Sequence, residues 1–276
     1  MFSLDGYQAV HAQGGVVRRT DRRVLAISGA DRASWLQGLV TNDVESLAEG
    51  EVRYAAYLTP QGRMITDMNV TASGNRLLLD VPAPLAASLR DKLDGLIFSE
   101  DAQVTDESGR LLVWTVINDG FIDVIGQALP ADFAALPEID LDTFDVIRIE
   151  RGVPKFLADM NEDTIPLEAG IEERAISFTK GCYVGQEVIV RVTHRGGGRV
   201  AKRLVKWHAD DSASVVPMPD SRIFSSEKDV GRVTSSAFSP SLNKVIGLGY
   251  VHRDHADAGT ALTIVWNDAR ITALVK

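Results

Sequence analysis

The sequence predicts an α+β protein in which a mixed region is followed by a small β-barrel. Up to about residue 203, apolar runs of strand length alternate with segments of helical periodicity. After that point only strand-like runs occur, six of them in roughly 70 residues, and they are separated by Gly, Asp, Asn, Ser or Pro. We therefore expect two domains among the 276 residues, a mixed region over residues 1–203 and a β-barrel over residues 204–276.

The first elements of the mixed region are a strand and a helix. Residues 24–27 are a short apolar run, typical of a buried strand. Ser28 and Asp31 have the spacing of a capping box, so we expect a helix to begin there. Trp35 and Leu39, spaced i and i+4, give this helix one apolar face. Trp35 is therefore expected in the core rather than at a ligand site.

A hairpin is the most distinct pattern in the mixed region. Residues 52–58 and 63–71 are rich in strand formers, and residues 59–62 between them have proline and glycine where a tight turn favours them. Further strands are expected at residues 76–81, 102–105, 111–116 and 121–125, helices at residues 85–96 and 140–151, and an irregular connection at residues 154–170. The barrel strands are expected at residues 204–207, 222–224, 230–236, 245–251, 262–266 and 271–275.

Composition and charge exclude several classes of protein. Hydrophobic residues make up 45% of the chain and charged residues 24%, as in globular domains rather than disordered or fibrous chains. No apolar run approaches the ~20 residues of a membrane-spanning helix, and the first residues lack the features of a secretory signal. The net charge of −9 disfavours nucleic acid as a partner. We expect a cytoplasmic protein that contacts neither membrane nor nucleic acid directly.

One stretch of this acidic chain is basic. Seven basic residues and a single acid lie between Lys180 and Lys206. Such a strip favours one particular anionic ligand over a long polyanion. Within it, His194, Arg195 and Arg199 flank three glycines, a pattern that favours either a cationic contact to the anionic tail of a ligand or a solvated linker into the barrel.

Cys182 is the only cysteine in the sequence, so it has no intrachain disulfide partner and cannot by itself build a zinc or iron–sulfur site. It lies in the segment Lys180-Gly-Cys-Tyr-Val-Gly-Gln-Glu187, where glycines on both sides allow the backbone to approach a ligand closely. Lys180, and the amino end of a helix starting near Gly185, are expected to favour the reactive thiolate. The alternative is a buried, inert cysteine.

No other motif indicates a clear chemistry. His252 and His255 with Asp257 are close in sequence, but nothing in the pattern makes them converge on an ion, and we expect no metal site. The sequence has no convincing match to the signatures of Ser-His-Asp hydrolases, P-loops or dinucleotide-binding sites.

Residues 180–187 resemble the signature octapeptide of the YgfZ family, bacterial and mitochondrial relatives of the folate-dependent aminomethyltransferase of the glycine cleavage system. Three other stretches agree with it in the family's order, WLQGLVTNDV at 35–44, PQGRMITD at 60–67 and RIERGVP at 148–154. The resemblance implies a ring of three subdomains around a folate-sized channel, two mixed α/β folate-binding units plus the C-terminal β-barrel. It implies tetrahydrofolate as the ligand, iron–sulfur proteins or cluster-assembly factors as partners, and a role in iron–sulfur cluster assembly or repair that needs the cysteine.

Within the octapeptide, the resemblance implies that Cys182 carries the chemistry, and we expect Lys180, two residues away, to assist it through its charge. We expect Gln186 and Glu187 to orient the loop, and Arg191 to lie one helical turn onward if a helix starts at Gly185. The residues of the loop region expected to contribute to the folate site are Tyr183, Gln186, Glu187 and Arg191.

At the hairpin, the resemblance implies a contact between Asp67 and the N–H donors of the pterin, while the alternative is an exposed strand acid. Arg63 is expected either to pair with a folate carboxylate or to lie at the surface. Where the transferases carry two consecutive acids, this chain has Thr66 before Asp67, so the transferase's catalytic acid is expected to be missing. Aminomethyl or other one-carbon transfer, and a non-catalytic adaptor with folate as a structural ligand, are the alternatives to the iron–sulfur role.

Overall fold

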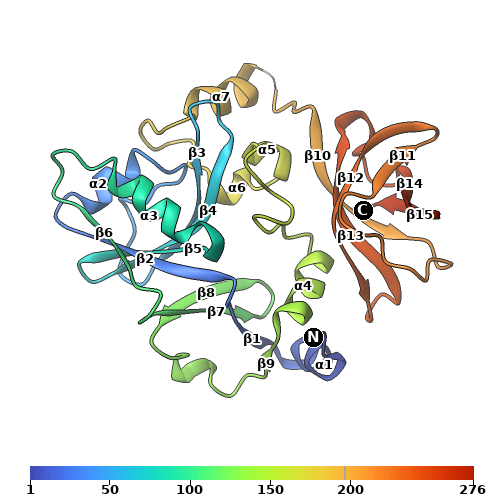
Figure 1. The fold of residues 1–276 in the computed structure, drawn as a ribbon, viewed down its shortest axis with the longest axis horizontal. Helices are drawn as coiled ribbons and strands as arrows, with labels where there is room; N and C mark the ends of the chain where they lie inside the picture. The colour runs from blue at the N-terminus through green and yellow to red at the C-terminus, as the bar shows by residue number, and fades with distance from the viewer. Residues whose placement is uncertain (196) are drawn as a thin grey trace. The chain divides into compact units, whose positions relative to one another are not determined.

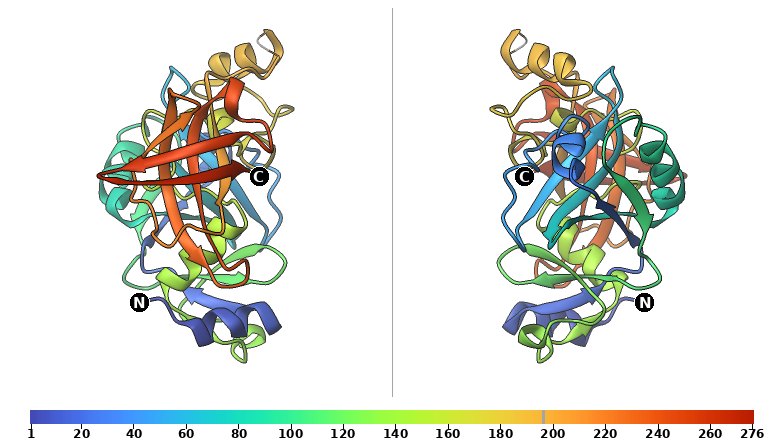
Figure 2. Two further views of the ribbon diagram at one scale, coloured as in Figure 1. Left: turned by 90° about the vertical axis from the view of Figure 1, so that its right-hand side faces the viewer. Right: turned by 90° about the vertical axis from the view of Figure 1, so that its left-hand side faces the viewer.

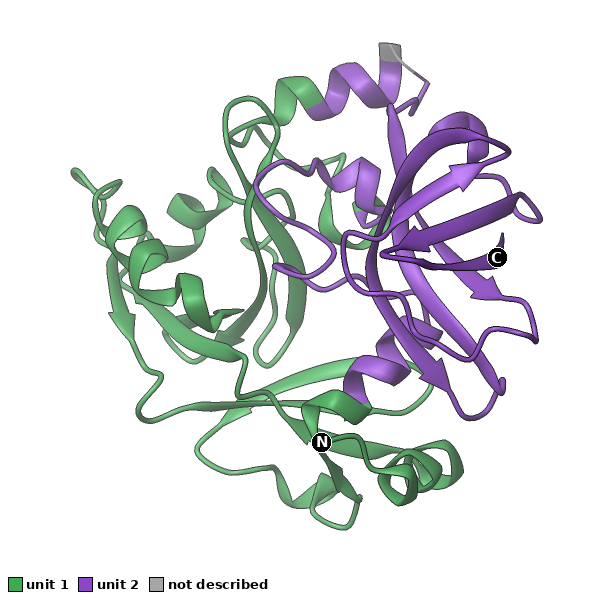
Figure 3. Ribbon diagram, turned by 45° about the vertical axis from the view of Figure 1, so that its right-hand side comes forward, with its two compact units in different colours: residues 1–143, 172–188 green, residues 144–171, 189–276 purple. Residues whose placement is uncertain are grey.

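The computed structural model describes residues 1–195 and 197–276 (Figure 1). The described chain forms two compact units (Figure 3). Unit 1 contains Met1–Thr143 and Glu172–Val188, and unit 2 contains Phe144–Ile171 and Ile189–Lys276. Both units are therefore built from two separate stretches of the chain, and residues 144–171 belong to the same unit as the C-terminal strands.

The larger sheet of unit 1 has five antiparallel strands in the order β3-β4-β5-β2-β6. They are β2 (Arg22–Ser28), β3 (Val52–Leu58), β4 (Met64–Ser73), β5 (Arg76–Pro82) and β6 (Gln103–Asp106). The predicted strands and hairpin are confirmed. Helices α2 (Arg32–Gln37) and α3 (Ala86–Asp94) contribute Leu36, Leu89 and Leu93 to its core. Burying one such side chain stabilises a fold by about 1.5–3 kcal/mol.

The start predicted for the first of these helices is wrong. Ser28 is the last residue of β2 and pairs with Arg76, while α2 begins at Arg32 with Asp31 at its N-cap. The Asp31 carboxylate makes no capping bond and accepts instead from the Asp101 amide at 2.8 Å. Because the helix ends at Gln37, Leu39 lies beyond it, although Trp35 is in the core as predicted.

The second sheet of unit 1 has the order β8-β7-β1-β9. Its strands are β1 (Gly15–Arg18), β7 (Leu112–Ile117), β8 (Phe121–Gly126) and β9 (Glu138–Ile139), and α1 (Leu4–Gln13) precedes them. The sequence predicts β7 and β8 but not α1, β1 or β9. β1 is four residues long and pairs antiparallel with β7 and parallel with β9, so distant partners rather than a local pattern determine it. The 3₁₀ turns η1 (Ala83–Leu85) and η2 (Ala131–Phe133) and helix α6 (Glu172–Ala175) also belong to unit 1.

Unit 2 contains a closed barrel of six strands in the order β10-β13-β12-β11-β14-β15, which confirms the predicted barrel (Figure 2, left). The strands are β10 (Lys202–Ala209), β11 (Arg222–Ser225), β12 (Lys228–Ser239), β13 (Lys244–His252), β14 (Ala261–Trp266) and β15 (Ala269–Val275). Trp207 is fully buried in its core, and a Cβ at Gly247 would lie 2.2 Å from the Trp207 ring. A glycine is therefore required there on β13.

Short helices connect these elements. Helix α4 (Leu141–Glu150) is confirmed, and the predicted irregular connection after it contains only the short helix α5 (Pro166–Ala169). Helix α7 (Gln186–Val190) continues into the π-helical turn η3 (Arg191–Arg195), and η4 (Arg253–His255) follows the barrel strand β13. No helix in the described part of the chain has the length and apolar character that crossing a membrane requires.

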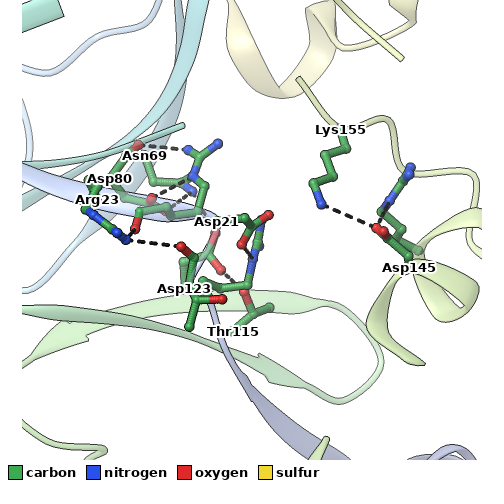
Figure 4. A network of polar contacts seen from close by, with 12 residues as sticks. Asp21, Arg23, Asn69, Asp80, Thr115, Asp123, Asp145 and Lys155 are labelled. Carbon is green, nitrogen blue, oxygen red and sulfur yellow. Dashed lines mark hydrogen bonds and ion pairs between the residues drawn. The ribbon is translucent and has the colours of Figure 1, made fainter. Parts of the chain in front are cut away.

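Arg148, the first residue of the RIERGVP stretch, forms a buried polar network in unit 2. It is buried, and its guanidinium donates to the Asp159 carboxylate at 2.7 Å and to the Ser235 hydroxyl of β12 at 2.9 Å. Asp159 also accepts from the Thr234 hydroxyl at 2.5 Å. At the edge of this network, the Lys155 ammonium lies 3.6 Å from Asp145 (Figure 4). Arg148 therefore connects α4 and the following segment to the barrel.

Candidate functional site

Cys182 is a free, exposed cysteine in the segment between α6 and α7. Its neighbour Tyr183 is buried, and this burial raises the pKa of the Tyr183 phenol to about 12. The chain therefore alternates at this point between a side chain that anchors the loop and a thiol that faces solvent. The alternative of a buried cysteine is wrong, while the reactivity of the thiol stays a prediction.

Lys180 anchors the loop on the N-terminal side of the thiol. Its ammonium donates to the carbonyls of Gln37, Val40 and Asn42 at 2.5, 2.6 and 3.0 Å, at the C-terminal end of α2 and just after it. The last carbonyls of a helix lack partners within the helix and can accept from an ammonium at this position. Burial lowers the pKa of Lys180 to about 8, and the nearby acids of residues 43 and 45 only partly oppose the shift.

Thr41 and Asn42 bind the segment that leads into the loop. The buried Thr41 hydroxyl donates to the Ala175 carbonyl at 2.6 Å, and the Ser177 amide donates to the Thr41 carbonyl at 3.0 Å. The Asn42 side-chain amide donates to the Arg174 carbonyl at 2.8 Å. The stretch WLQGLVTNDV, which includes both residues and all three carbonyls around Lys180, thus supports the backbone before Cys182.

Two glycines position the loop on the side that follows the thiol. Gly185 has φ +85°, and a Cβ on it would lie 2.6 Å from the Thr59 carbonyl oxygen in the β3–β4 turn. Gly62 in the same turn has φ +75°, and a Cβ on it would lie 2.9 Å from the Val188 Cβ in the middle of α7. Both positions need the left-handed backbone and the close approach that only glycine allows. A Cβ at Gly181, by contrast, would meet no atom within 4 Å.

Three of the four stretches that carry the resemblance therefore meet in unit 1. Residues 35–44 bind the N-terminal side of the Cys182 loop, and the turn that begins residues 60–67 packs against its C-terminal side. Figure 1 shows α7 beside the end of the β3–β4 hairpin. The thiol of Cys182 is thus exposed on a loop that is supported on both sides.

Asp67 lies in a buried polar network and not at the surface, so the alternative of an exposed strand acid is wrong. It is 5% exposed, and its two carboxylate oxygens accept from the Arg22 guanidinium and from the Tyr54 hydroxyl, each at 2.9 Å. Arg22 also donates to the Asp80 carboxylate at 2.6 Å. Burial raises the pKa of Tyr54 well above its usual value, and the Asp67 carboxylate adds to this shift. Tyr54 therefore remains protonated and donates to Asp67.

The same network continues into the second sheet of unit 1 (Figure 4). Asn69 donates to Asp80 at 3.2 Å and to Asp123 of β8 at 2.6 Å. Thr115 donates to Asp123 and accepts from Arg19 at 3.1 Å. Burial raises the pKa of Asp80, and the Asp123 charge adds to this effect while Arg22 opposes it. The network thus holds two guanidiniums, of Arg22 and Arg19, against the carboxylates of Asp67, Asp80 and Asp123.

The other expected site residues do not join this network in unit 1. Arg63 is exposed and follows Gly62 at the hairpin end, four residues along β4 from Asp67, a separation of about 13 Å for an extended strand. Gln186 is half-buried and Glu187 exposed in the first turn of α7. The structure thus places Arg63, Gln186 and Glu187 near the two ends of the contact between hairpin and loop.

Arg191 is exposed at the start of η3, which directly follows α7, and α7 begins at Gln186 rather than at Gly185. The structure describes only part of the segment in which His194, Arg195 and Arg199 are expected to contact an anion. Gly196 and the side chain of Arg195 lie outside the described part of the chain. The folate contacts expected from all these residues stay predictions.

Sequence reasoning missed several residues that support the site, namely Arg22, Thr41, Asn42, Tyr54 and Asp80. Asp80 had a usable signal, because it interrupts the apolar run Leu-Leu-Leu-Asp-Val of a predicted strand. A carboxylate in a buried strand requires a partner of opposite charge. Nothing local indicates that the partner is Arg22, which lies 58 residues earlier.

Comparisons with known proteins agree with this architecture. The GCVT N-terminal domain matches residues 3–114, and the glycine cleavage T-protein C-terminal barrel domain matches residues 202–276. An iron–sulfur cluster assembly factor IBA57 homolog, mitochondrial, of Pyricularia oryzae is 30% identical over 215 residues, which cover 66% of this chain and 54% of that protein. The chain thus spans about half the length of this fungal relative.

Two further relatives cover nearly the whole chain. An aminomethyltransferase of Halothermothrix orenii is 24% identical over 329 residues, covering 99% of this chain and 89% of that protein. The crystal structure of the glycine cleavage system aminomethyltransferase T from Bartonella henselae superposes with a TM-score of 0.83 at 17% identity, covering 99% of this chain and 87% of that one. The superposition establishes the fold. The chain contains the N-terminal domain and the C-terminal barrel domain of the GcvT-like superfamily and belongs to this superfamily.

Proposed function

We propose that this protein binds tetrahydrofolate in the cytoplasm and supports the assembly or repair of iron–sulfur clusters through the thiol of Cys182. The observation that carries the proposal is the exposure of Cys182 on a loop supported on both sides, by Lys180 and by Gly185. The fungal relative named as an iron–sulfur cluster assembly factor supports the process. The family membership supports the ligand.

The polar cluster at Asp67 fits the hydrogen-bonding edge of a pterin. A carboxylate has about four acceptor positions, and Arg22 and Tyr54 each use one on Asp67. Asp67 and Asp80 share the guanidinium of Arg22, so Asp67 keeps acceptor positions for amino and ring N–H donors. Bound tetrahydrofolate would supply a one-carbon carrier. Tyr54 and Arg22 would hold the Asp67 carboxylate in place for it.

In this proposal, the Cys182 thiol contacts the iron–sulfur cluster or the protein that carries it. Its thiolate is a ligand for iron, and the proton is released to solvent when the metal binds. The sequence contains one cysteine, and a cluster usually needs several such ligands, so the partner must provide the others. A loop already supported at Lys180 and Gly185 loses little conformational freedom in such a contact.

Complementation in cells that lack this protein tests the thiol. The Cys182→Ser chain is expected to leave iron–sulfur enzyme activity at the level of the deletion, because the hydroxyl neither ionises near neutral pH nor binds iron comparably. Thr179→Ser, an exposed position in the same segment, is the matched control and should restore activity fully. Full restoration by Cys182→Ser at equal protein level would remove the thiol from the mechanism.

Aminomethyl transfer is the second candidate, because relatives named aminomethyltransferase align with 99% of the chain. The residue before Asp67 disfavours it. Thr66 is fully buried, and its hydroxyl donates to the Asp67 carbonyl at 3.0 Å, so no second carboxylate stands at this point of the hairpin. Turnover of an aminomethyl-carrier substrate with tetrahydrofolate would favour this candidate, and its absence in a chain that binds tetrahydrofolate would favour the iron–sulfur role.

A further inference from the structure

Three arginines line one cavity at the rim of the barrel in unit 2. Arg199, Arg203 and Arg253 meet around a space of about 440 Å³. The register of the sheet brings them together, because the start of β10 pairs with the end of β13 and the Arg253 amide donates to the Ala201 carbonyl at 3.1 Å. The end of the basic strip noted in the sequence thus meets a cation about 50 residues later.

Two of these arginines have no ion-pair partner within the part of the chain that the structure describes. The Arg199 and Arg203 guanidiniums have no hydrogen bond or ion pair with the part of the chain that the structure describes. Arg253 lies 3.5 Å from Asp254, and both side chains are exposed, so this pair contributes little. Like charges that line a common cavity repel one another, and an anion bound between them removes the repulsion.

We infer that this cavity, which we call the rim cavity, binds a small ligand with two or more neighbouring oxyanion groups. Ligand sites typically measure about 300–1,000 Å³, so the rim cavity exceeds the need of a single small ion. Guanidiniums bind carboxylates and phosphates in bidentate geometry, and three of them match several oxyanions. Asp254 and Asp257 also line the cavity and disfavour a long polyanion such as nucleic acid.

This inference is independent of the proposed function. The rim cavity lies entirely within unit 2, whereas Cys182 and Asp67 belong to unit 1, and it uses none of their residues. Its ligand chemistry has two possible sources, a phosphate chain or a chain of carboxylates. Inorganic tripolyphosphate and tri-γ-glutamate separate them.

Calorimetric titration of the full chain with each probe at low salt tests the inference. At least one probe should bind the wild-type chain, and Arg203→Gln and Arg253→Gln should each weaken it about tenfold or more, as expected for the loss of a charge-assisted hydrogen bond. Arg203→Lys keeps the charge and loses the bidentate geometry, so its affinity should fall between those of the wild type and Arg203→Gln. The matched control is Arg222→Gln, an exposed barrel arginine on β11 that pairs with Asp229 and is outside the cavity.

The probe that binds identifies the source of the ligand. Binding of neither probe to the wild-type chain overturns the inference. So does an equal loss in Arg222→Gln, since binding would then follow overall charge. Thermal unfolding of each variant, and an unchanged alkylation rate of Cys182, show that the chain remains folded and that any loss belongs to the rim cavity.

Discussion

Exchanging the two glycines on either side of Cys182 for alanine separates the backbone requirement from simple proximity to the thiol. Gly185→Ala introduces a Cβ 2.6 Å from the Thr59 carbonyl oxygen and 3.1 Å from the Leu58 Cβ, at a residue with φ +85°. Gly181→Ala introduces the same group where no atom lies within 4 Å and where φ is outside the left-handed region. The two variants add the same atoms three or fewer residues from the same cysteine.

The expected difference in the free energy of unfolding follows from two costs. An L-residue in the left-handed region costs about 1–2 kcal/mol. Forcing a methyl group against fixed backbone costs about 1–3 kcal/mol more. Gly185→Ala should therefore destabilise the chain by about 2–5 kcal/mol, whereas Gly181→Ala should change its stability by no more than about 0.5 kcal/mol.

Two measurements check this pair. Equilibrium urea unfolding gives the free energies, and the rate of Cys182 alkylation by iodoacetamide reports whether the loop has left its support on the β3–β4 turn. The alkylation rate should change in Gly185→Ala and stay at the wild-type value in Gly181→Ala. An equal loss of stability in both variants, or a greater loss in Gly181→Ala, would refute the packing described for the loop.

Three other predictions concern buried charges. Arg148→Met should destabilise the chain by about 3–5 kcal/mol in urea unfolding, because the Asp159 side chain, 0% exposed, loses its cation; a loss below about 1 kcal/mol would contradict this. The pKa of Lys180 is lowered to about 8 in the folded chain, against about 10.4 in the unfolded chain. Between these two pH values the unfolded chain binds more protons than the folded chain, so the free energy of unfolding of the wild type should rise with pH across this range. Because Lys180 is partly exposed and solvent screens its charge, this rise should be about 1–2 kcal/mol larger than in Lys180→Met. Parallel plots of unfolding free energy against pH for the two chains would disprove it. Asp67→Asn should weaken tetrahydrofolate binding in calorimetry at least about tenfold by removing one charged acceptor, with Arg22 still paired to Asp80; equal affinity would exclude Asp67 from the site.

Local patterns in the sequence determined much of the fold. The alternation of residues 52–71 around a Pro-Gly turn predicts the β3–β4 hairpin, and the six short strands after residue 203 predict the closed barrel. The capping-box spacing at Ser28 was misleading because the β2 strand continues through that residue. At Ser28, pairing with β5 determines the backbone conformation, and the local capping pattern does not.

The candidate site divides along the same line. The glycine-flanked loop around Cys182 is visible in the sequence, since it depends on residue type and short spacing, and the family resemblance indicates Asp67. The partners of these residues are not, because the Lys180 ammonium meets a carbonyl 143 residues earlier and Arg22 meets Asp67 45 residues later. Sequence alone also treats Gly181 and Gly185 alike. Only the folded chain distinguishes them, because steric contact depends on atoms that distant segments bring within 3 Å and that no local periodicity encodes.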